Sequence, residues 1–438
     1  MSTWLPDLVY VDGRFQADRA VVCDGAGKIE KIVDGKDAAD PIRLSGRAML
    51  PGMVNAHSHA FQRVIRGRTE HRSEHATDSF WTWREQMYAA ANTLEPDDLY
   101  AVSRMAFLEM ALTGITAVGE FHYLHHSRDG SPYSDPNLLE REVIRAARDV
   151  GIRIALLRVA YARAGYQTEA NPQQVRFIED TPDLYLKNLE QLLDVKDDDL
   201  AWIGVAPHSV RAVPLDYLKA IVAFANERAL PVHMHVAEQP AEVSACIAEY
   251  GRSPVALLET EGLLSKRFTA VHAIHVTPKA VAALARNGAY ICACPTTERN
   301  LGDGVVPVDA YFDAGVRVAL GTDSQIQIDL LEDARELEYH LRLQKMERNV
   351  LAPMIAQRLF DCATVNGAAS IGFDGGRIRP GAPADFFSVD LNDPSIAGAP
   401  VDDLLTTIVF SLSQRAVRDV VVAGKRIVEN GKHSTSTF

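Results

Sequence analysis

Two histidines separated by one residue follow a short apolar run near the beginning of the chain. His57 and His59 end the segment PGMVNAHSH of residues 51–59. In an extended strand, residues i and i+2 share a face, so both imidazoles can reach one ion. Such pairs also occur by chance. The pair therefore predicts a metal site only if further ligands exist elsewhere in the chain.

Two further candidate ligands lie at the ends of later apolar runs. His235 lies in the run VHMHV of residues 232–236, and Asp323 ends the run VALGTD of residues 318–323. In a barrel of parallel strands, catalytic residues come from the C-terminal ends of different strands. Three imidazoles and one carboxylate suit a zinc ion and leave room for a water ligand, although iron or manganese could occupy the same set.

The apolar run of residues 232–236, the fifth such run in the barrel segment, contains a second histidine, His233. It shares a face with His235, so spacing alone does not choose between the two. We favour His235 because Glu238 follows it by three residues, where a loop can carry that carboxylate over the ion. His272 ends the next apolar run and is expected in the site, whereas the neighbouring His275 is expected in a loop.

The elements that must position these residues form a repeating pattern. Short apolar runs alternate with amphipathic helical stretches, such as residues 97–113 and 214–229. Such alternation predicts parallel strands, and eight units predict an α/β fold, a (β/α)₈ TIM barrel over residues 51–374. The eight strands are expected to end near Asn55, Glu120, Val159, Ala206, Val236, His272, Cys294 and Gly321.

Both ends of the chain have the pattern of β structure. Residues 1–50 and 375–438 contain short β-type runs separated by turn residues. Neither end has enough strand to close a core alone, so we expect the two to combine into one small β-sandwich domain. The longest insertion in the barrel, residues 62–92, is rich in Arg, His and aromatic residues and is expected to form a lid or substrate loop.

Composition excludes several classes of protein. With 438 residues, 47% hydrophobic and 24% charged, the chain has the composition of a folded protein with room for two domains. A net charge of -13 argues against a nucleic-acid partner. Five scattered cysteines argue against a secreted disulfide framework. Because the sequence shows neither a signal-peptide pattern nor 18 consecutive apolar residues, we expect a cytoplasmic protein without a membrane partner.

The segments around these ligands resemble the amidohydrolase superfamily, in its aminohydrolase (deaminase) branch. The resemblance rests on PGMVNAHSH, on HVAE of residues 235–238, on His272, on GTDS of residues 321–324 and on GRIRPGAPADF of residues 376–386. It implies a distorted barrel with a flanking β-sandwich, and a homodimer. Members with two ions carry a bridging lysine after the fourth strand. Residues 202–208 (WIGVAPH) contain no lysine, which implies one ion per subunit.

The predicted chemistry is hydrolytic deamination by a metal-activated hydroxide. An ion can lower the pKa of its bound water to about 7. Asp323 and His272 would accept or orient the proton of that water, and Glu238 would pass a proton to the leaving nitrogen of an amidine. The other zinc deaminase design carries His-x-Glu and Pro-Cys-x-x-Cys motifs. Those motifs are absent, and Cys292 and Cys294 are expected in a buried strand.

A second group of segments indicates the substrate. Within the branch, the chain is most similar to enzymes that convert N-formimino-L-glutamate and water to N-formyl-L-glutamate and ammonia in histidine degradation. The similarity rests on residues 59–63 (HAFQR), 80–85 (FWTWRE), 120–126 (EFHYLHH) and 206–212 (APHSVRA). It implies a set of substrate contacts made by Gln62, Arg84, Tyr123, His208 and Arg211.

Charge supports part of this assignment. A dicarboxylate needs cationic partners, and arginine pairs with carboxylates in a bidentate manner. Arg84 and Arg211 supply two, although spacing does not exclude Arg66 and Arg68 in the same enlarged loop as Arg84. The main alternative is a deaminase of guanine or another cyclic amidine, whose neutral ring would leave paired arginines poorly compensated. A non-catalytic binding protein on a decayed barrel is disfavoured by the intact ligand set.

Overall fold

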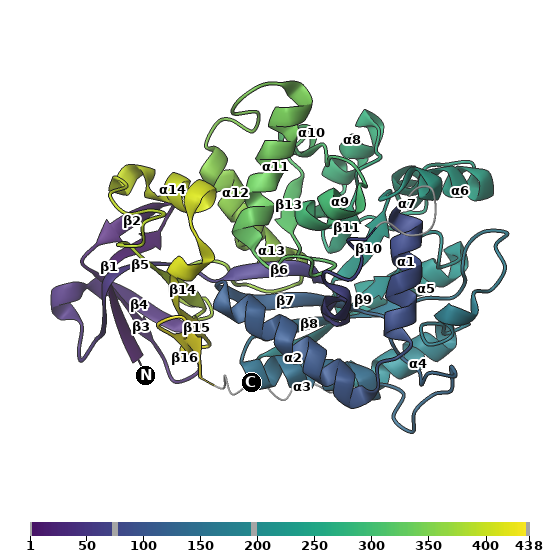
Figure 1. The fold of residues 1–438 in the computed structure, drawn as a ribbon, viewed down its shortest axis with the longest axis horizontal. Coiled ribbons are helices and arrows are strands. Elements are labelled where there is room, and N and C mark those ends of the chain that lie inside the picture. The colour runs from purple at the N-terminus through teal and green to yellow at the C-terminus, as the bar shows by residue number, and fades with distance from the viewer. Residues whose placement is uncertain (1, 72–77, 194–198, 435–438) are drawn as a thin grey trace.

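A barrel of parallel strands occupies one end of the molecule (Figure 1). The computed structural model describes residues 2–71, 78–193 and 199–434. Within these residues, the barrel strands follow one another in chain order around the sheet. They are β6 (Met53–Ser58), β7 (Ile115–His122), β8 (Arg153–Ala160), β9 (Ala201–Pro207), β10 (Val232–Val236), β11 (Phe268–His272), β12 (Tyr290–Ala293) and β13 (Arg317–Leu320). The predicted TIM-like fold class is confirmed, and each strand ends within three residues of its expected end.

The barrel closes between its first and last strands, at the residues expected to bind metal. The Asp323 amide donates to the His57 carbonyl and the His59 amide donates to the Asp323 carbonyl, both at 3.0 Å. Gly321 permits this approach, because a Cβ added there would lie 2.7 Å from the Cβ of His57. Strand closure therefore brings candidate ligands from both ends of the barrel sequence together.

Helices connect the strands. Residues 97–113 and 214–229 were predicted as helical and correspond to α2 (Pro96–Leu112) and α5 (Leu215–Arg228) within one residue at each end. In α3 (Leu138–Val150), Leu139, Val143 and Ile144 lie on the buried face, and Gly151 ends the helix with a left-handed φ of 86°. The connecting helices are α2 (Pro96–Leu112), α3 (Leu138–Val150), α4 (Pro182–Leu192), α5 (Leu215–Arg228), α6 (Pro240–Tyr250), α7 (Pro254–Thr260), α8 (Pro278–Arg286), α9 (Pro295–Leu301), α10 (Val308–Asp313), α11 (Leu330–Lys345), α12 (Ile355–Ala363) and α13 (Val365–Ser370).

The two ends of the chain combine, as expected from their strand patterns, and their described strands form one mixed sheet. β5 (Ile42–Pro51) lies at its centre, parallel to β1 (Ser2–Val11) and antiparallel to β14 (Phe386–Asp390). Figure 1 shows these purple and yellow strands together beside the barrel. Within the described residues the sheet has nine strands. Its others are β2 (Arg14–Ala17), β3 (Arg19–Cys23), β4 (Ile29–Asp34), β15 (Val417–Val422), β16 (Lys425–Glu429) and β17 (Lys432–His433), and α14 (Leu404–Ser411) lies between β14 and β15 in the chain.

The insertion predicted as a lid or substrate loop contains two helical segments. η2 (Ala60–Ile65) directly follows the first histidine pair, and α1 (Phe80–Ala91) forms the second part. Ser79 begins α1 by accepting a hydrogen bond from the Trp81 amide. Residues 72–77 of this predicted loop lie outside the described residues. Lid motion of the insertion stays a prediction.

A buried charge network lies beside β8. Arg158 forms a bidentate pair with Glu179, at 2.6 and 3.0 Å, and also contacts Glu140 at 3.1 Å. Burial alone would raise the pKa of Glu179, but Arg158 outweighs this and lowers it to about 2. The Glu179 amide donates to the Tyr161 carbonyl at 3.0 Å. The network therefore supports the segment that follows β8.

The described helices include none that is both long and apolar enough to cross a membrane. The five cysteines all lie within the described residues and are buried and free. Cys292 lies in β12, and Cys294 follows that strand directly. The expectation of a buried strand is confirmed for Cys292, whereas Cys294 is buried one residue beyond the end of that strand.

Candidate metal centre and substrate pocket

Four side chains from three parts of the barrel meet at its C-terminal mouth. His57 lies in β6 and His59 follows it, His235 lies in β10, and Asp323 follows β13. Their ligand atoms all lie within 4.8 Å of one another, and all four residues are buried. The Nε2 atoms of His57 and His59 are 3.5 and 3.3 Å from Oδ1 of Asp323. The structure therefore assembles the predicted ligand set.

His57 shows that this cluster fits a metal ion. Among the residues that the structure describes, neither of its ring nitrogens has a hydrogen-bond partner, although the side chain is fully buried. An unpaired buried polar group is costly and rare. Burial lowers the pKa of His57 to about 3, so its imidazole is neutral and can offer a lone pair. A divalent cation would satisfy it.

The other two histidines are oriented by backbone carbonyls. Nδ1 of His59 lies 2.8 Å from the Phe121 carbonyl, and Nδ1 of His235 lies 3.2 Å from the His208 carbonyl. A carbonyl only accepts hydrogen bonds, so Nδ1 carries the hydrogen in each ring. Nε2 of each ring then keeps its lone pair, which is directed to the cluster. In metal sites, a hydrogen bond to the other ring nitrogen commonly orients a ligating histidine in this way.

His233 does not join the cluster. Its Nε2 lies 2.9 Å from the Ser370 carbonyl at the end of α13. Along β10, this histidine precedes His235 by two residues and lies farther from the strand's C-terminal end. Spacing along the strand could not distinguish His233 from His235, but their different depths in the barrel do. His275 lies in a loop, as expected, with Nε2 2.9 Å from the Asp303 carbonyl.

His272 lies among three carboxylates. Its Nε2 is 3.6 Å from Oε1 of Glu238 and 3.7 Å from Oδ2 of Asp323. Nδ1 is 3.1 Å from Oε1 of Glu298, which also accepts a hydrogen bond from the Cys294 amide. Burial would lower the pKa of His272, but the Glu238 and Glu298 side chains raise it well above its usual value. Glu298 was not among the predicted site residues, because nothing in its local sequence pattern marks it.

The backbone beneath the site adopts unusual conformations. His272 and Asp323 have φ angles of 66° and 47°, in the left-handed region that non-glycine residues rarely occupy. Ala237, just before Glu238, has a φ of 52°. Glu242 holds that turn by accepting the amide hydrogens of Ala237 and Glu238, at 3.1 and 3.2 Å. Backbone strain of this kind concentrates at functional sites.

Glu238 combines burial with access to the pocket. Its side chain is 13% exposed, and it lines the same cavity as His59 and Asp323. Burial is the main cause that raises its pKa, to about 7. A carboxyl group with this pKa can both accept and donate a proton near neutral pH.

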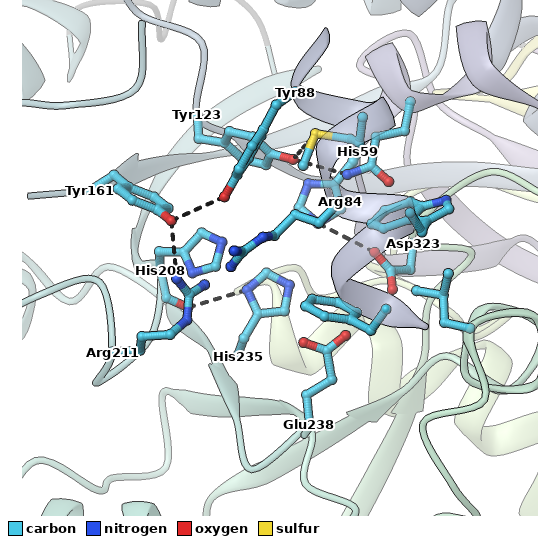
Figure 2. Close-up of a pocket in the computed structure, with 15 residues that line it drawn as sticks. His59, Arg84, Tyr88, Tyr123, Tyr161, His208, Arg211, His235, Glu238 and Asp323 are labelled. Carbon is cyan, nitrogen blue, oxygen red and sulfur yellow. Dashed lines mark hydrogen bonds and ion pairs between the residues drawn. The ribbon is translucent and has the colours of Figure 1, made fainter. Parts of the chain in front are cut away.

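A pocket lies over the cluster (Figure 2). All five residues that the sequence resemblance assigned to substrate line it: Gln62, Arg84, Tyr123, His208 and Arg211. Gln62 donates a hydrogen bond to the Tyr123 hydroxyl at 2.9 Å. Neighbouring Arg211 and Arg84 add to burial in lowering the pKa of His208 well below its usual value. The structure thus places both predicted arginines at the pocket.

Arg84 and Arg211 form no close ion pair with the carboxylates that the structure describes. Among the described residues, no carboxylate oxygen lies within 4.0 Å of a guanidinium nitrogen of either arginine, the distance that defines an ion pair. The Arg84 guanidinium lies 4.5 Å from the Trp81 ring, and Arg211 donates to the Ala164 carbonyl at 2.9 Å. Arg66 instead pairs with a carboxylate of Glu109 at 2.8 Å, and Arg68 is exposed and does not line the pocket. The structure therefore distinguishes Arg84 from Arg66 and Arg68 of the same insertion, which spacing in the sequence could not do.

Several pocket residues were not predicted. Those on α1 recur with the spacing of one helix face, a signal that the sequence contained but that was not used. Tyr161 follows β8 and had no such signal. The unpredicted lining residues are Phe80, Trp83, Met87, Tyr88, Tyr161 and Leu301.

Comparison with known proteins places the chain in a family. The model of the Amidohydrolase family matches residues 48–427. The chain belongs to this family. It is 41% identical over 401 residues to formimidoylglutamate deiminase of Pseudomonas aeruginosa, covering 90% of this chain and 88% of that protein. It is 29% identical over 430 residues to 5-methylthioadenosine/S-adenosylhomocysteine deaminase of Halobacterium salinarum, covering 97% and 90%.

Solved structures share the architecture of this amidohydrolase. An amidohydrolase from Brucella melitensis superposes with a TM-score of 0.91 at 36% identity, covering 99% of this chain and 96% of that one. An adenosine deaminase from Xanthomonas campestris, solved with bound zinc, gives 0.83 at 24% identity, covering 99% and 94%. The second likeness supports the fold alone.

Proposed function

We propose that this amidohydrolase converts N-formimino-L-glutamate and water to N-formyl-L-glutamate and ammonia. One observation carries the proposal: Arg84 and Arg211, without ion-pair partners among the described residues, line the pocket over the ligand cluster. The 41% identity to a formimidoylglutamate deiminase supports the same substrate.

The charge of the pocket favours a dicarboxylate over a neutral ring. A guanidinium group forms bidentate, charge-assisted hydrogen bonds with a carboxylate. A purine or another neutral cyclic amidine would leave Arg84 and Arg211 desolvated without compensation. The two arginines therefore favour the proposed substrate over guanine and over 5-methylthioadenosine, which appears in the name of the 29% identical relative.

The ligand chemistry supports a single zinc ion. Three imidazoles and one carboxylate form a donor set that zinc commonly takes. β9 (Ala201–Pro207) contains no lysine that could bridge to a second ion. When bound by His57, His59, His235 and Asp323, zinc would supply a water molecule with a pKa lowered toward neutrality.

The residues of the chain then manage protons and orientation. The carboxylate of Asp323 would receive a proton from water, and Nε2 of His272, 3.7 Å from Oδ2 of that carboxylate, would orient the water by donating a hydrogen bond. Glu238 would donate a proton to the leaving nitrogen, since its carboxyl group faces the same cavity. Gln62, Tyr123 and His208 would fix the amidine between these groups, while Arg84 and Arg211 hold the carboxylates. Ammonia is released when the carbon–nitrogen bond breaks.

Parallel substrate assays test this proposal. Purified protein of measured metal content would be given N-formimino-L-glutamate, N-formimino-L-aspartate, guanine and 5-methylthioadenosine, with ammonia release recorded for each. We expect the highest kcat/KM with N-formimino-L-glutamate. Turnover of either purine without turnover of the formimino acids would overturn the assignment.

A further inference from the structure

A hydrogen-bonded group of pocket residues remains without an assigned role. Tyr88 lies on α1, Tyr161 follows β8, and Gln174 ends η3 (Pro172–Gln174). Nε2 of Gln174 lies 2.8 Å from the Tyr88 hydroxyl and 2.7 Å from the Tyr161 hydroxyl. The two hydroxyls are 3.4 Å apart. Figure 2 shows Tyr161 between Tyr88 and Arg211, linked to both by dashed lines.

The amide of Gln174 donates to both tyrosines. Its oxygen is buried and has no partner among the described residues. If oxygen and nitrogen were exchanged, the amide oxygen would accept from both hydroxyls, but two buried N–H hydrogens would lose every acceptor. One unpaired carbonyl oxygen is tolerated better than two unpaired N–H hydrogens. Gln174 therefore uses both of its hydrogens on the tyrosine oxygens.

One hydroxyl hydrogen of this hydrogen-bonded group is left over and can be donated into the pocket. The Tyr161 oxygen accepts from Gln174 and from Nη1 of Arg211, at 3.3 Å, which occupies both of its lone pairs. The Tyr161 hydrogen is then donated to Tyr88, whose oxygen also accepts from Gln174. With the Tyr161 oxygen fully occupied, this assignment leaves the Tyr88 hydrogen without an acceptor within the group, and Tyr88 lines the cavity and is 2% exposed.

We infer that Tyr88 is a specificity-determining residue that donates a hydrogen bond to a substrate carboxylate, and that Tyr161 and Gln174 are positioning residues for Tyr88 and Arg211. The inference deepens the proposed function and rests on it for the dicarboxylate substrate. Arg84 lies one helical turn before Tyr88 on α1, with its guanidinium 5.4 Å from the Tyr88 ring. The carboxylate would thus meet one hydroxyl and two guanidinium groups. A neutral ligand would leave all three uncompensated.

Tyr88→Phe tests the donor directly, since it removes one hydroxyl group. We expect the KM for N-formimino-L-glutamate to rise about tenfold or more, the size expected for one hydrogen bond to a charged group, while kcat changes much less. Tyr100→Phe is the matched control, because the Tyr100 hydroxyl bonds Asp149 on α3, away from the pocket. An unchanged KM in folded Tyr88→Phe protein would overturn the inference.

Gln174→Leu tests the positioning role. This variant should raise KM while leaving kcat and metal content near the wild-type values, whereas a general loss of structure would lower all of them together. Added to Tyr88→Phe, it should raise KM by much less than it does alone, since both changes remove the same donor. Equal effects in the two backgrounds would contradict the positioning role. Should Gln174→Leu not fold, Tyr161→Phe takes its place with the same expected pattern.

A binding measurement separates this inference from the proposed function. Glutarate carries two carboxylates and no amidine, so its Kd for the metal-loaded protein reports on carboxylate recognition without turnover. We expect Tyr88→Phe to raise that Kd about tenfold or more. If glutarate binding depends on Tyr88 but N-formimino-L-glutamate is not turned over, the proposed function fails and the inference stands. If turnover is high and the Kd is unchanged, the inference fails alone.

Discussion

His59 and Asp323 are joined twice, once through the backbone and once through their side chains. The His59 amide donates to the Asp323 carbonyl at 3.0 Å, while Nε2 of His59 lies 3.3 Å from Oδ1 of Asp323. The hydrogen bonds that close the barrel therefore also bring two candidate ligands together. Any change that opens this junction should disturb the metal site.

Replacing His235 and replacing His233, the two histidines of β10, should have different consequences. His235→Ala should lose the bound ion, because it removes one of four clustered ligands. His233→Ala should retain the ion and lower the melting temperature, because it removes a buried side chain that bonds the Ser370 carbonyl. Metal analysis and thermal denaturation of both variants check this. Loss of the ion from His233→Ala alone would show that the wrong histidine was chosen.

Glu238→Gln should bind its ion and lose most turnover. The amide keeps the shape of the side chain but cannot exchange a proton with the leaving nitrogen. General acid–base groups typically contribute about 10² to 10⁴ in rate, so kcat should fall by that order. Steady-state assays with metal analysis measure the effect. Near-normal kcat in this variant would exclude a proton-transfer role.

Arg84→Ala and Arg211→Ala should weaken binding of the dicarboxylate and leave metal content intact. Each removes a charge-assisted contact of about 1.5 to 3 kcal/mol, so KM should rise at least tenfold. Arg68→Ala is the control, since that exposed arginine belongs to the same insertion but does not line the pocket. Lost metal in either pocket variant would indicate a structural role instead.

The buried Arg158–Glu179 pair should make stability depend on pH. The pKa of Glu179 is lowered from 4.5 to about 2 in the fold. Its contribution to the free energy of unfolding, about 3 kcal/mol, is therefore present above pH 4.5 and is lost as pH falls through 2. Glu179→Gln should destabilise the protein more at pH 7 than at pH 3 in urea unfolding. Exposed Glu227→Gln should have little effect at either pH. An equal loss at both pH values in Glu179→Gln would contradict the linkage.

Much of the site could be predicted because it lies on regular strands. His57, His59 and Asp323 are placed by strand ends, whose positions follow from apolar runs in the sequence. His233 and His235 could not be separated in this way, because the two share a face and differ only in depth. Tyr161 and Gln174 were missed because the irregular segment after β8 positions them, and periodicity carries no information about its path.

The expected fold class held for a similar reason. Each end of the chain alone was too short in strands, which predicted that the two would combine. The strand pairing itself could not be predicted: β5 lies parallel to β1 and antiparallel to β14, and β14 begins more than 330 residues after β5 ends. Long-range strand pairing depends on complementary surfaces that a single sequence does not display.

A zinc titration of metal-free protein tests the central claim most directly. Ammonia release from N-formimino-L-glutamate would be measured after each addition of zinc. Four clustered ligands and the absence of a lysine in β9 predict that activity rises linearly and stops rising at one ion per chain. Full activity in metal-free protein, or a rise that continues to two ions per chain, would contradict a single-ion hydrolase.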